Sequence, residues 1–141
     1  MSVHDYETAE KLLKSNKRFK RRRLTNNTWI ERSTMNANRI MLIHHKTVII
    51  TYFKDGTVIF KNDGWGSKTT RERMDDFQNK INIFSQKKKW WYCIGCEWSA
   101  KYPFYEGLII RPDGSIDEFN EEVDSQIKSE NYGHLMGRQT Y

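Results

Sequence analysis

The sequence has few cysteines and no long apolar run, and both absences narrow the class of protein. Two cysteines among 141 residues are too few for the disulfide framework of a small secreted protein. Apolar runs such as Ile40–Ile43 and Val48–Ile50 have the length of strands, whereas a membrane span needs about 20 residues. The Lys-rich amino terminus lacks the apolar centre of a secretory signal. We therefore expect a cytoplasmic protein that does not enter membranes.

Internal repeats and an interdomain linker are also absent, which favours a single domain. A chain of 141 residues can bury an ordinary core without metals or disulfides. Aromatic residues make up 13% of the chain, too many for a disordered one. We expect a basic amphipathic helix over 1–24, one α+β domain over 25–130, and a flexible tail over 131–141.

The net charge of +6 is unevenly distributed along the chain. Met1–Leu24 holds eight Lys or Arg residues against three Asp or Glu residues, a net charge of +5. Asp113–Glu130 holds seven acidic residues against one Lys, a net charge of −6. Two interpretations follow: the two ends pair with each other, or the basic end binds a polyanion while the acidic end repels wrong partners.

The first predicted element is a helix from about Asp5 to Arg22. Apolar residues recur there at three- and four-residue steps and form one narrow stripe: Tyr6, Ala9, Leu12, Leu13 and Phe19. The other faces are rich in Lys and Arg, and cations in the last turns suit the negative end of the helix dipole. The polar segment Leu24–Thr28 ends the helix.

The middle of the chain predicts strands. The β candidates are Thr28–Ser33, Arg39–His44, Thr47–Phe53 and Thr57–Lys61. Asp55-Gly56 predicts a type I′ turn, whose two central residues need positive φ. Both faces of Val48–Phe53 are largely apolar, so this strand should be central and covered.

A second helix and further hairpins follow. Thr69-Thr70-Arg71-Glu72 resembles a capping box and predicts a helix start near Thr69 or Thr70. Further strands are expected at Asn82–Gln86, Lys89–Cys96, Glu106–Ile110 and Ser115–Phe119, with a Pro-containing turn at Arg111–Gly114. Acidic Asp117–Lys128 reads as a last helix. The predicted class is α+β: a basic amino-terminal helix, an antiparallel β-sheet of hairpins with one inserted helix packed on it, and a short acidic carboxyl-terminal helix.

The residues that suggest catalysis or metal binding do not form a complete set. Cys93 and Cys96 are separated by two residues, but no further Cys or His has zinc-module spacing, so buried thiols are favoured over a metal or redox pair. His44-His45 lacks a marked nucleophile, and a strand-end His with its tip in water is the favoured interpretation. We expect no enzyme activity, no metal and no cofactor.

The segment Gly64–Arg71 is a candidate anion site. Glycines lead into a helix start that carries hydroxyl and basic side chains, and such a start exposes backbone amides to anions. The candidate residues are Lys68, Thr69, Thr70 and Arg71. The alternative is that Thr69 only caps the helix, with Trp65 packed across it.

Two basic patches are candidates for nucleic-acid binding, because Lys and Arg neutralise phosphates and exposed aromatic rings stack on unpaired bases. The first patch, on the expected amino-terminal helix, comprises Lys14, Lys17, Arg18, Lys20, Arg21, Arg22 and Arg23. The second, at a hairpin tip beside Trp90-Trp91-Tyr92, comprises Lys87, Lys88 and Lys89. An acidic protein partner and a solvated or self-paired helix are the alternatives.

Residues 27–116 resemble a group of small proteins of tailed bacteriophages. The resemblance is carried by Asn27-Thr28-Trp29-Ile30-Glu31, by Gly64-Trp65 followed by Thr69-Thr70-Arg71, and by a Trp-Tyr strand. It implies an early or accessory role in an infected cell and no catalytic residue. The leading hypothesis is an accessory protein that binds nucleic acid or a nucleoprotein in the host cytoplasm. The alternatives are a host-takeover or anti-defence protein that binds a host protein or a nucleotide, and a structural component of a virion or ribonucleoprotein.

Overall fold

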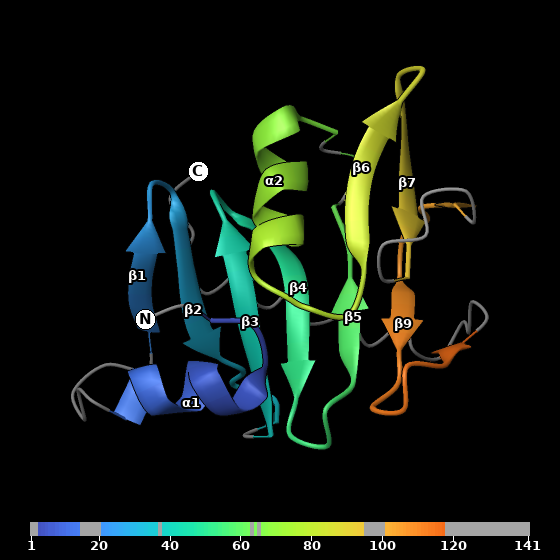
Figure 1. The fold of residues 1–141 in the computed structure, drawn as a ribbon. Helices are drawn as coiled ribbons and strands as arrows, with labels where there is room; N and C mark the ends of the chain where they lie inside the picture. The colour runs from blue at the N-terminus through green and yellow to red at the C-terminus, as the bar shows by residue number, and fades with distance from the viewer. Residues whose placement is uncertain are drawn as a thin grey trace.

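Two antiparallel sheets and two helices form the part of the chain that the computed structural model describes, residues 3–14, 21–36, 38–62, 64, 66–94 and 101–117 (Figure 1). The larger sheet has seven strands in the order β1-β2-β3-β4-β5-β9-β10, and the smaller has the order β6-β7-β8. The predicted α+β class is confirmed. The strands are β1 (Arg21–Thr25), β2 (Thr28–Arg32), β3 (Arg39–His44), β4 (Thr47–Phe53), β5 (Val58–Phe60), β6 (Asn82–Gln86), β7 (Lys89–Cys93), β8 (Tyr102–Pro103), β9 (Leu108–Ile110) and β10 (Ile116–Asp117).

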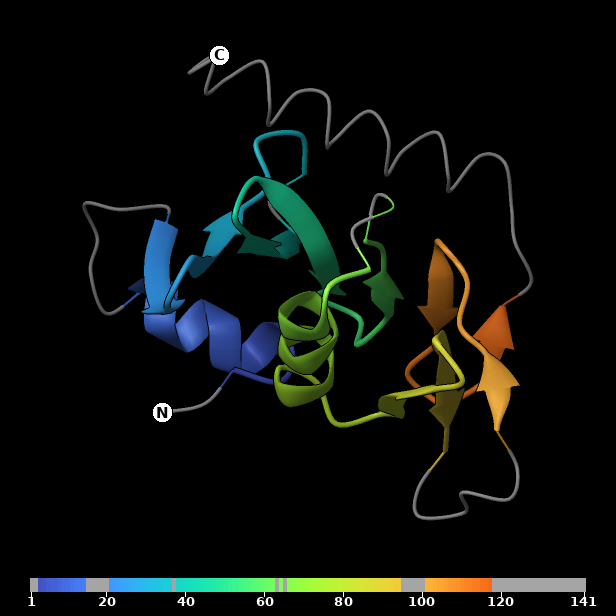
Figure 2. The same ribbon diagram turned by 90° about the horizontal axis from the view of Figure 1, so that it is seen from above.

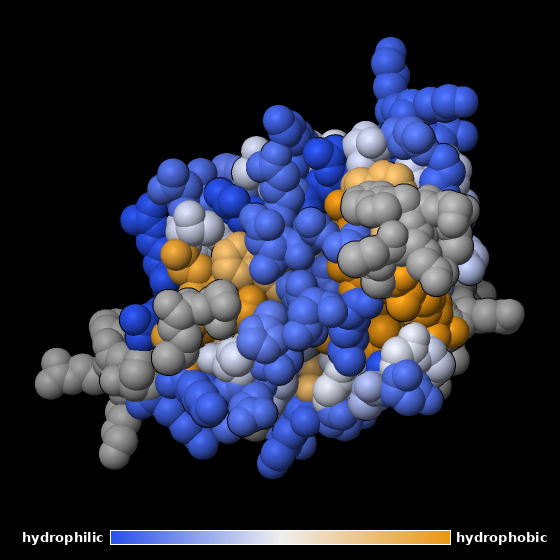
Figure 3. Space-filling view, in the orientation of Figure 1, coloured by the Kyte–Doolittle hydropathy of each residue, from blue (hydrophilic) through white to orange (hydrophobic). Residues whose placement is uncertain are grey.

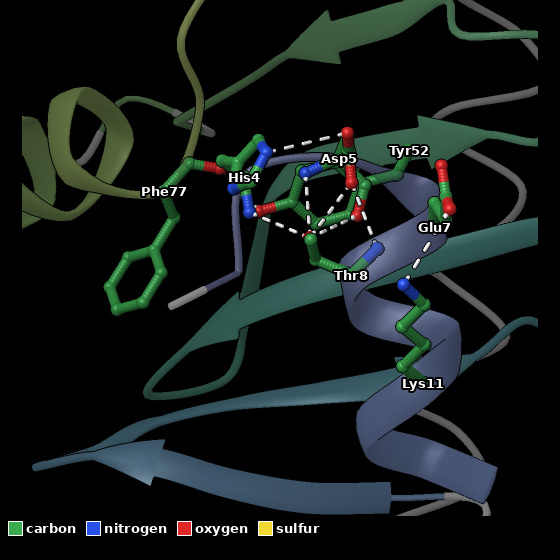
Figure 4. A network of polar contacts seen from close by, with 7 residues as sticks. All are labelled: His4, Asp5, Glu7, Thr8, Lys11, Tyr52 and Phe77. Atoms are coloured by element: carbon green, nitrogen blue, oxygen red, sulfur yellow. Dashed lines mark hydrogen bonds and ion pairs between the residues drawn. The ribbon is translucent and has the colours of Figure 1, made fainter. Parts of the chain in front are cut away.

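Helix α1 (Tyr6–Lys14) lies on the sheet through the predicted apolar stripe, of which Tyr6, Ala9, Leu12 and Leu13 are buried. Asp5 begins the helix: the Thr8 amide donates to Asp5 Oδ1 at 2.9 Å, and the Asp5 amide donates to Thr8 Oγ1 at 3.2 Å (Figure 4). Each residue therefore satisfies an amide of the other at the helix start.

The predicted continuation of this helix to Arg22 is wrong, because α1 ends at Lys14 and Arg21–Thr25 form the edge strand β1. Asn26-Asn27 makes a two-residue turn in which Asn27 has φ 53°, and it pairs β1 with β2 from Thr25 opposite Thr28. Ladder hydrogen bonds to β2 outweigh the helix propensity of arginine, which is only a weak preference.

The predicted bounds of β3 and β4 are confirmed, and β4 is the fourth strand of the seven with Val48–Tyr52 buried. The type I′ turn predicted at Asp55-Gly56 is wrong, since only Gly56 has positive φ there. The Gly56 amide donates to Phe53 O and the Phe53 amide donates to Thr57 O, both at 2.9 Å. This is a three-residue loop closed by a bulge at glycine.

Helix α2 (Lys68–Asp76) packs on the sheet through Met74, which is fully buried. It starts earlier than predicted, because Ser67 caps it by accepting from the Thr70 amide at 3.1 Å. At its other end the buried Tyr52 hydroxyl of β4 donates to Phe77 O at 2.6 Å (Figure 4). The helix is thus fixed to the centre of the sheet at its carboxyl end.

Both helices lie on one face of the seven-stranded sheet, as the view from above shows (Figure 2). The main core lies between them and the sheet, and includes Ile30, Leu42, Tyr52 and Phe60.

The single antiparallel sheet that the sequence predicted is corrected to two sheets. The predicted carboxyl-terminal helix at 117–128 and the tail at 131–141 lie almost wholly outside the described residues. Neither α1 nor α2 is long and apolar enough to cross a membrane.

Candidate nucleic-acid interface

The β6–β7 hairpin presents three consecutive lysines at its tip. Gln86 pairs with Lys89, so Lys87 and Lys88 are the two central residues of the turn. Their φ values are 52° and 63°, which is the type I′ pattern that the sequence predicted at Asp55-Gly56. All three lysine side chains are exposed, and hydrophilic atoms project from the surface at this end of the hairpin (Figure 3).

The turn is costly for these residue types. A left-handed backbone costs about 1–2 kcal/mol for a residue with a Cβ, and Asn-Gly would fit this turn with less strain. The flanking ladder from Asn82 opposite Cys93 to Gln86 opposite Lys89 holds the turn in place. Lysine at both positions therefore places positive charge at the tip at the expense of stability.

Trp91 lies on the outer face of the small sheet, beside the lysines. Its indole Nε1 donates to Gln86 O at 3.1 Å, and the Lys101 ammonium lies 4.8 Å from the centre of its ring. Lys101 also donates to the Gln86 side chain. We call Lys87, Lys88, Lys89, Trp91 and Lys101 the hairpin patch; it combines four exposed lysines with one half-buried aromatic ring.

The other aromatic residues of β7 belong to the core. Trp90 packs on Phe104, with ring centres 5.5 Å apart, and Phe104 packs in turn on Phe60 of the main sheet at 6.5 Å. Tyr92 is buried on the same side as Trp90. Successive strand residues point to opposite faces, so of the predicted Trp90-Trp91-Tyr92 set only Trp91 belongs to the patch.

Polar contacts from α2 and from Gln78, which follows it, fix the position at which β6 begins. The Ile83 amide donates to Asp75 Oδ1 at 2.9 Å. The buried Gln78 side chain accepts from the Ile81 amide at 3.0 Å and donates to Ile81 O at 2.7 Å. The hairpin is therefore held against the rest of the fold in two places, through the aromatic residues of its inner face and through the residues at the start of β6.

The charges of α1 are largely paired within the helix. Lys11 lies 3.7 Å from Glu7, and Lys14, a predicted phosphate contact, lies 3.2 Å from Glu10. A hydrogen bond from the Tyr6 hydroxyl lowers the pKa of Glu10, and the charges of Lys14 and Arg32 lower it further. The other predicted contacts in this stretch, Lys17, Arg18 and Lys20, lie outside the described residues.

The three arginines predicted on the helix lie on β1 and point to different faces of the sheet. Arg22 faces α1 and donates to Leu12 O at 3.4 Å. Arg21 lies on the opposite face, 3.9 Å above the Trp29 ring, and Arg23 donates to Asn26 Oδ1 at 2.9 Å. The predicted helical flank that combined Lys14 with Arg21–Arg23 is therefore wrong.

The predicted anion residues at the start of α2 have mixed surroundings. Thr70 is buried, and its hydroxyl lies 2.7 Å from Ser67 Oγ. Lys68 pairs with Glu72 at 3.8 Å, while the Thr69 side chain is exposed and Arg71 is half-buried. Thr70 thus has a structural role in the cap, and anion binding at this helix start stays a prediction.

His44 is buried, unlike the water-exposed histidine that the sequence predicted, whereas His45 is exposed as expected. The Thr28 hydroxyl donates to Asn26 O at 3.0 Å, so His44 Nδ1, at 3.0 Å, donates to it. Arg73 Nε of α2 donates to the same oxygen at 3.3 Å. Burial lowers the pKa of His44, and the charges of His45 and Arg73 lower it further. This cluster joins α2 to β2 and β3.

Cys93 is buried, as the sequence favoured, and Cys96 lies outside the described residues. Within the described ranges no three His, Cys, Asp or Glu side chains come close enough to hold a metal ion.

Lys101 is the residue of the hairpin patch that the sequence did not predict. It is distant in the chain from the lysine run, and only the pairing of β7 with β8 brings its neighbours to Trp91.

One family model matches the chain over residues 6–111, and its description is Kyanoviridae Gp96 protein. The match extends from α1 to the residue after β9 and includes the whole hairpin patch. No curated protein and no solved structure matches the chain.

Proposed function

Because the chain belongs to the Kyanoviridae Gp96 family, a family of tailed-phage proteins, we propose that it is an accessory protein that binds single-stranded nucleic acid through the hairpin patch. It acts in the host cytoplasm as a binding protein and not as an enzyme. The observation that carries the proposal is that the small sheet and its hairpin tip bring together exposed Lys87–Lys89 and the Trp91 ring, over which the Lys101 ammonium lies.

The lysines supply affinity without sequence preference. Three of them follow one another at the hairpin tip, and the described contacts of Lys101 are with Gln86 and Trp91. An ammonium group that meets a phosphate releases a condensed counterion, which is the main source of non-specific affinity for nucleic acids. The lysines of α1 are a weaker candidate because their carboxylate partners already neutralise them.

Trp91 favours single strands over duplexes. A base in a duplex is stacked between its neighbours, whereas an unpaired base can stack on an aromatic side chain. Lys101 now covers part of the Trp91 ring at 4.8 Å and would move to a phosphate as a base takes its place. Stacking of this kind tolerates any base, which suits an accessory protein without sequence specificity.

The test is binding of fluorescently labelled single-stranded oligonucleotides, followed by anisotropy, to wild type and to Lys87→Gln/Lys88→Gln/Lys89→Gln. Loss of three phosphate contacts should weaken binding roughly 10- to 100-fold at moderate salt. The matched control is Lys11→Gln/Lys46→Gln/Lys54→Gln, which removes three exposed lysines elsewhere. The control should bind within about twofold of wild type.

Equal weakening of both triple variants would show that net charge, and not the patch, drives binding. Wild type that fails to bind any single strand at low salt would also exclude the proposal.

A further inference from the structure

The face of the seven-stranded sheet opposite α1 and α2, which we call the back face, is apolar. Trp29 pairs with Ile43 and Ile43 with Val48, while Ile59 pairs with Ile109, so the side chains form one apolar cluster on β2–β4 and a second on β5 and β9, with Thr51 between Met41 and Ile59. The apolar set is Trp29, Met41, Ile43, Val48, Ile59 and Ile109.

These side chains, except the half-buried Trp29, are buried even though neither described helix lies over them. Ile43 is 0% exposed, Val48 3% and Ile109 2%. Side chains in the middle of an open sheet face would be accessible to water, because strand neighbours cover only their edges. The back face therefore needs a cover that the described elements do not provide.

We propose that the acidic segment 118–130 of this chain docks on the back face. The chain leaves the sheet at Asp117, which is paired with Ile109, a back-face residue. The segment thus starts at the edge of the surface that needs a cover.

The length and the pattern of the segment fit this surface. Phe119, Val123 and Ile127 recur at four-residue steps, which places them on one side of a helix. Thirteen helical residues span about 20 Å, and strands are spaced about 4.8 Å apart, so such a helix crosses roughly four strands. From β10 this distance reaches β3, where Met41 and Ile43 lie.

The charges are complementary as well. Residues 118–130 carry five acidic residues against one lysine. On the back face, Arg21 lies 3.9 Å above the Trp29 ring and Arg39 lies 4.9 Å from the Phe53 ring, so guanidinium groups border the apolar surface. Docking brings the oppositely charged ends of the chain together and leaves the hairpin patch, on the other sheet, as the basic surface open to a partner.

The experiment is photocrosslinking of the full chain with p-benzoylphenylalanine in place of Val123. Val123 lies about 8 Å along such a helix from residue 118, which is less than two strand spacings from β10. The expected result is therefore a link within one molecule to the strands that hold Ile59 and Ile109, identified by mass spectrometry. The matched control places the same group at Ser125, about 200° further round a helix, where no such link is expected.

Links that form only between molecules would assign the back face to a second copy and overturn the proposal. Absence of the link from position 123, or equal links from 123 and 125, would overturn it too. The same crosslinking variants still bind oligonucleotides if the hairpin patch is the site, so the two proposals fail independently.

Discussion

Trp90 and Trp91 are neighbours in the chain, yet their surroundings are opposite. Trp90 packs on Phe104 in the core, while Trp91 lies on the outer face of the small sheet under the Lys101 ammonium. The difference follows from the alternation of side chains along a strand. Of these two side chains, only that of Trp91 is therefore expected to stack on bases.

Replacement of Trp91 by Ala should weaken binding of single strands by about 1–3 kcal/mol, roughly 5- to 150-fold, because one stacking ring is lost. Trp91→Phe retains a ring and should bind within a few-fold of wild type. Titrations with single-stranded and duplex oligonucleotides of one sequence provide the measurement. An equal loss for single strand and duplex would show that Trp91 does not stack on bases.

His44 gives the fold a pH dependence whose sign is fixed by its lowered pKa. The unfolded chain takes up a proton near the ordinary histidine value of about 6.5, whereas the folded protein does so only at lower pH. Below that pH the unfolded state binds more protons than the folded state. The free energy of unfolding therefore decreases as the pH falls, until His44 of the folded protein is also protonated. The carboxyl groups with lowered pKa, which are those of Asp5, Glu10, Asp55 and Asp113, affect stability only at more acidic pH.

Urea unfolding of wild type should therefore show lower stability at about pH 5.5 than at about pH 7.5. The variant His44→Gln should lose most of this difference, whatever its own stability. A pH dependence that is unchanged in the variant would place its origin in another group.

At the scale of helices and strands, the sequence predicted those elements whose conformation is determined by neighbouring residues in the chain. The bounds of β3 and β4 were predictable from apolar runs, and the turn at Arg111–Gly114 from its proline and glycine. The predicted helix failed at Arg21–Thr25, where pairing with β2 decides the conformation. The same applies to Lys87-Lys88, whose positive φ values come from the strand ladder and not from residue preference.

The strained turn predicts opposite effects on stability and on binding. Lys88→Gly removes the Cβ from a residue with φ 63° and should raise the free energy of unfolding by about 1 kcal/mol. The same change removes a phosphate contact and should weaken binding of single strands a few-fold. Urea unfolding and anisotropy on the same preparation measure both. A variant that is less stable than wild type would show that Lys88 forms contacts that outweigh its strain.

For the whole molecule, the sequence indicated that basic surfaces exist but not which residues lie together on each surface. The run Lys87–Lys89 could be found by composition, and its place at a hairpin tip by the strands around it. Lys101 and the separation of Trp91 from Trp90 depend on the pairing of β7 with β6 and β8. Less of the positive charge at the amino terminus is available to a partner than the sequence indicated, because Glu7 and Glu10 pair with the lysines of α1.

The most direct test of the account is the salt dependence of binding to single strands. Each phosphate neutralised contributes about −0.7 to the slope of log affinity against log salt, so four patch lysines predict a slope of about −3. For Lys87→Gln/Lys88→Gln/Lys89→Gln the slope should fall to about −1. Equal slopes for wild type and variant, or an affinity that salt does not change, would contradict phosphate binding at the hairpin patch.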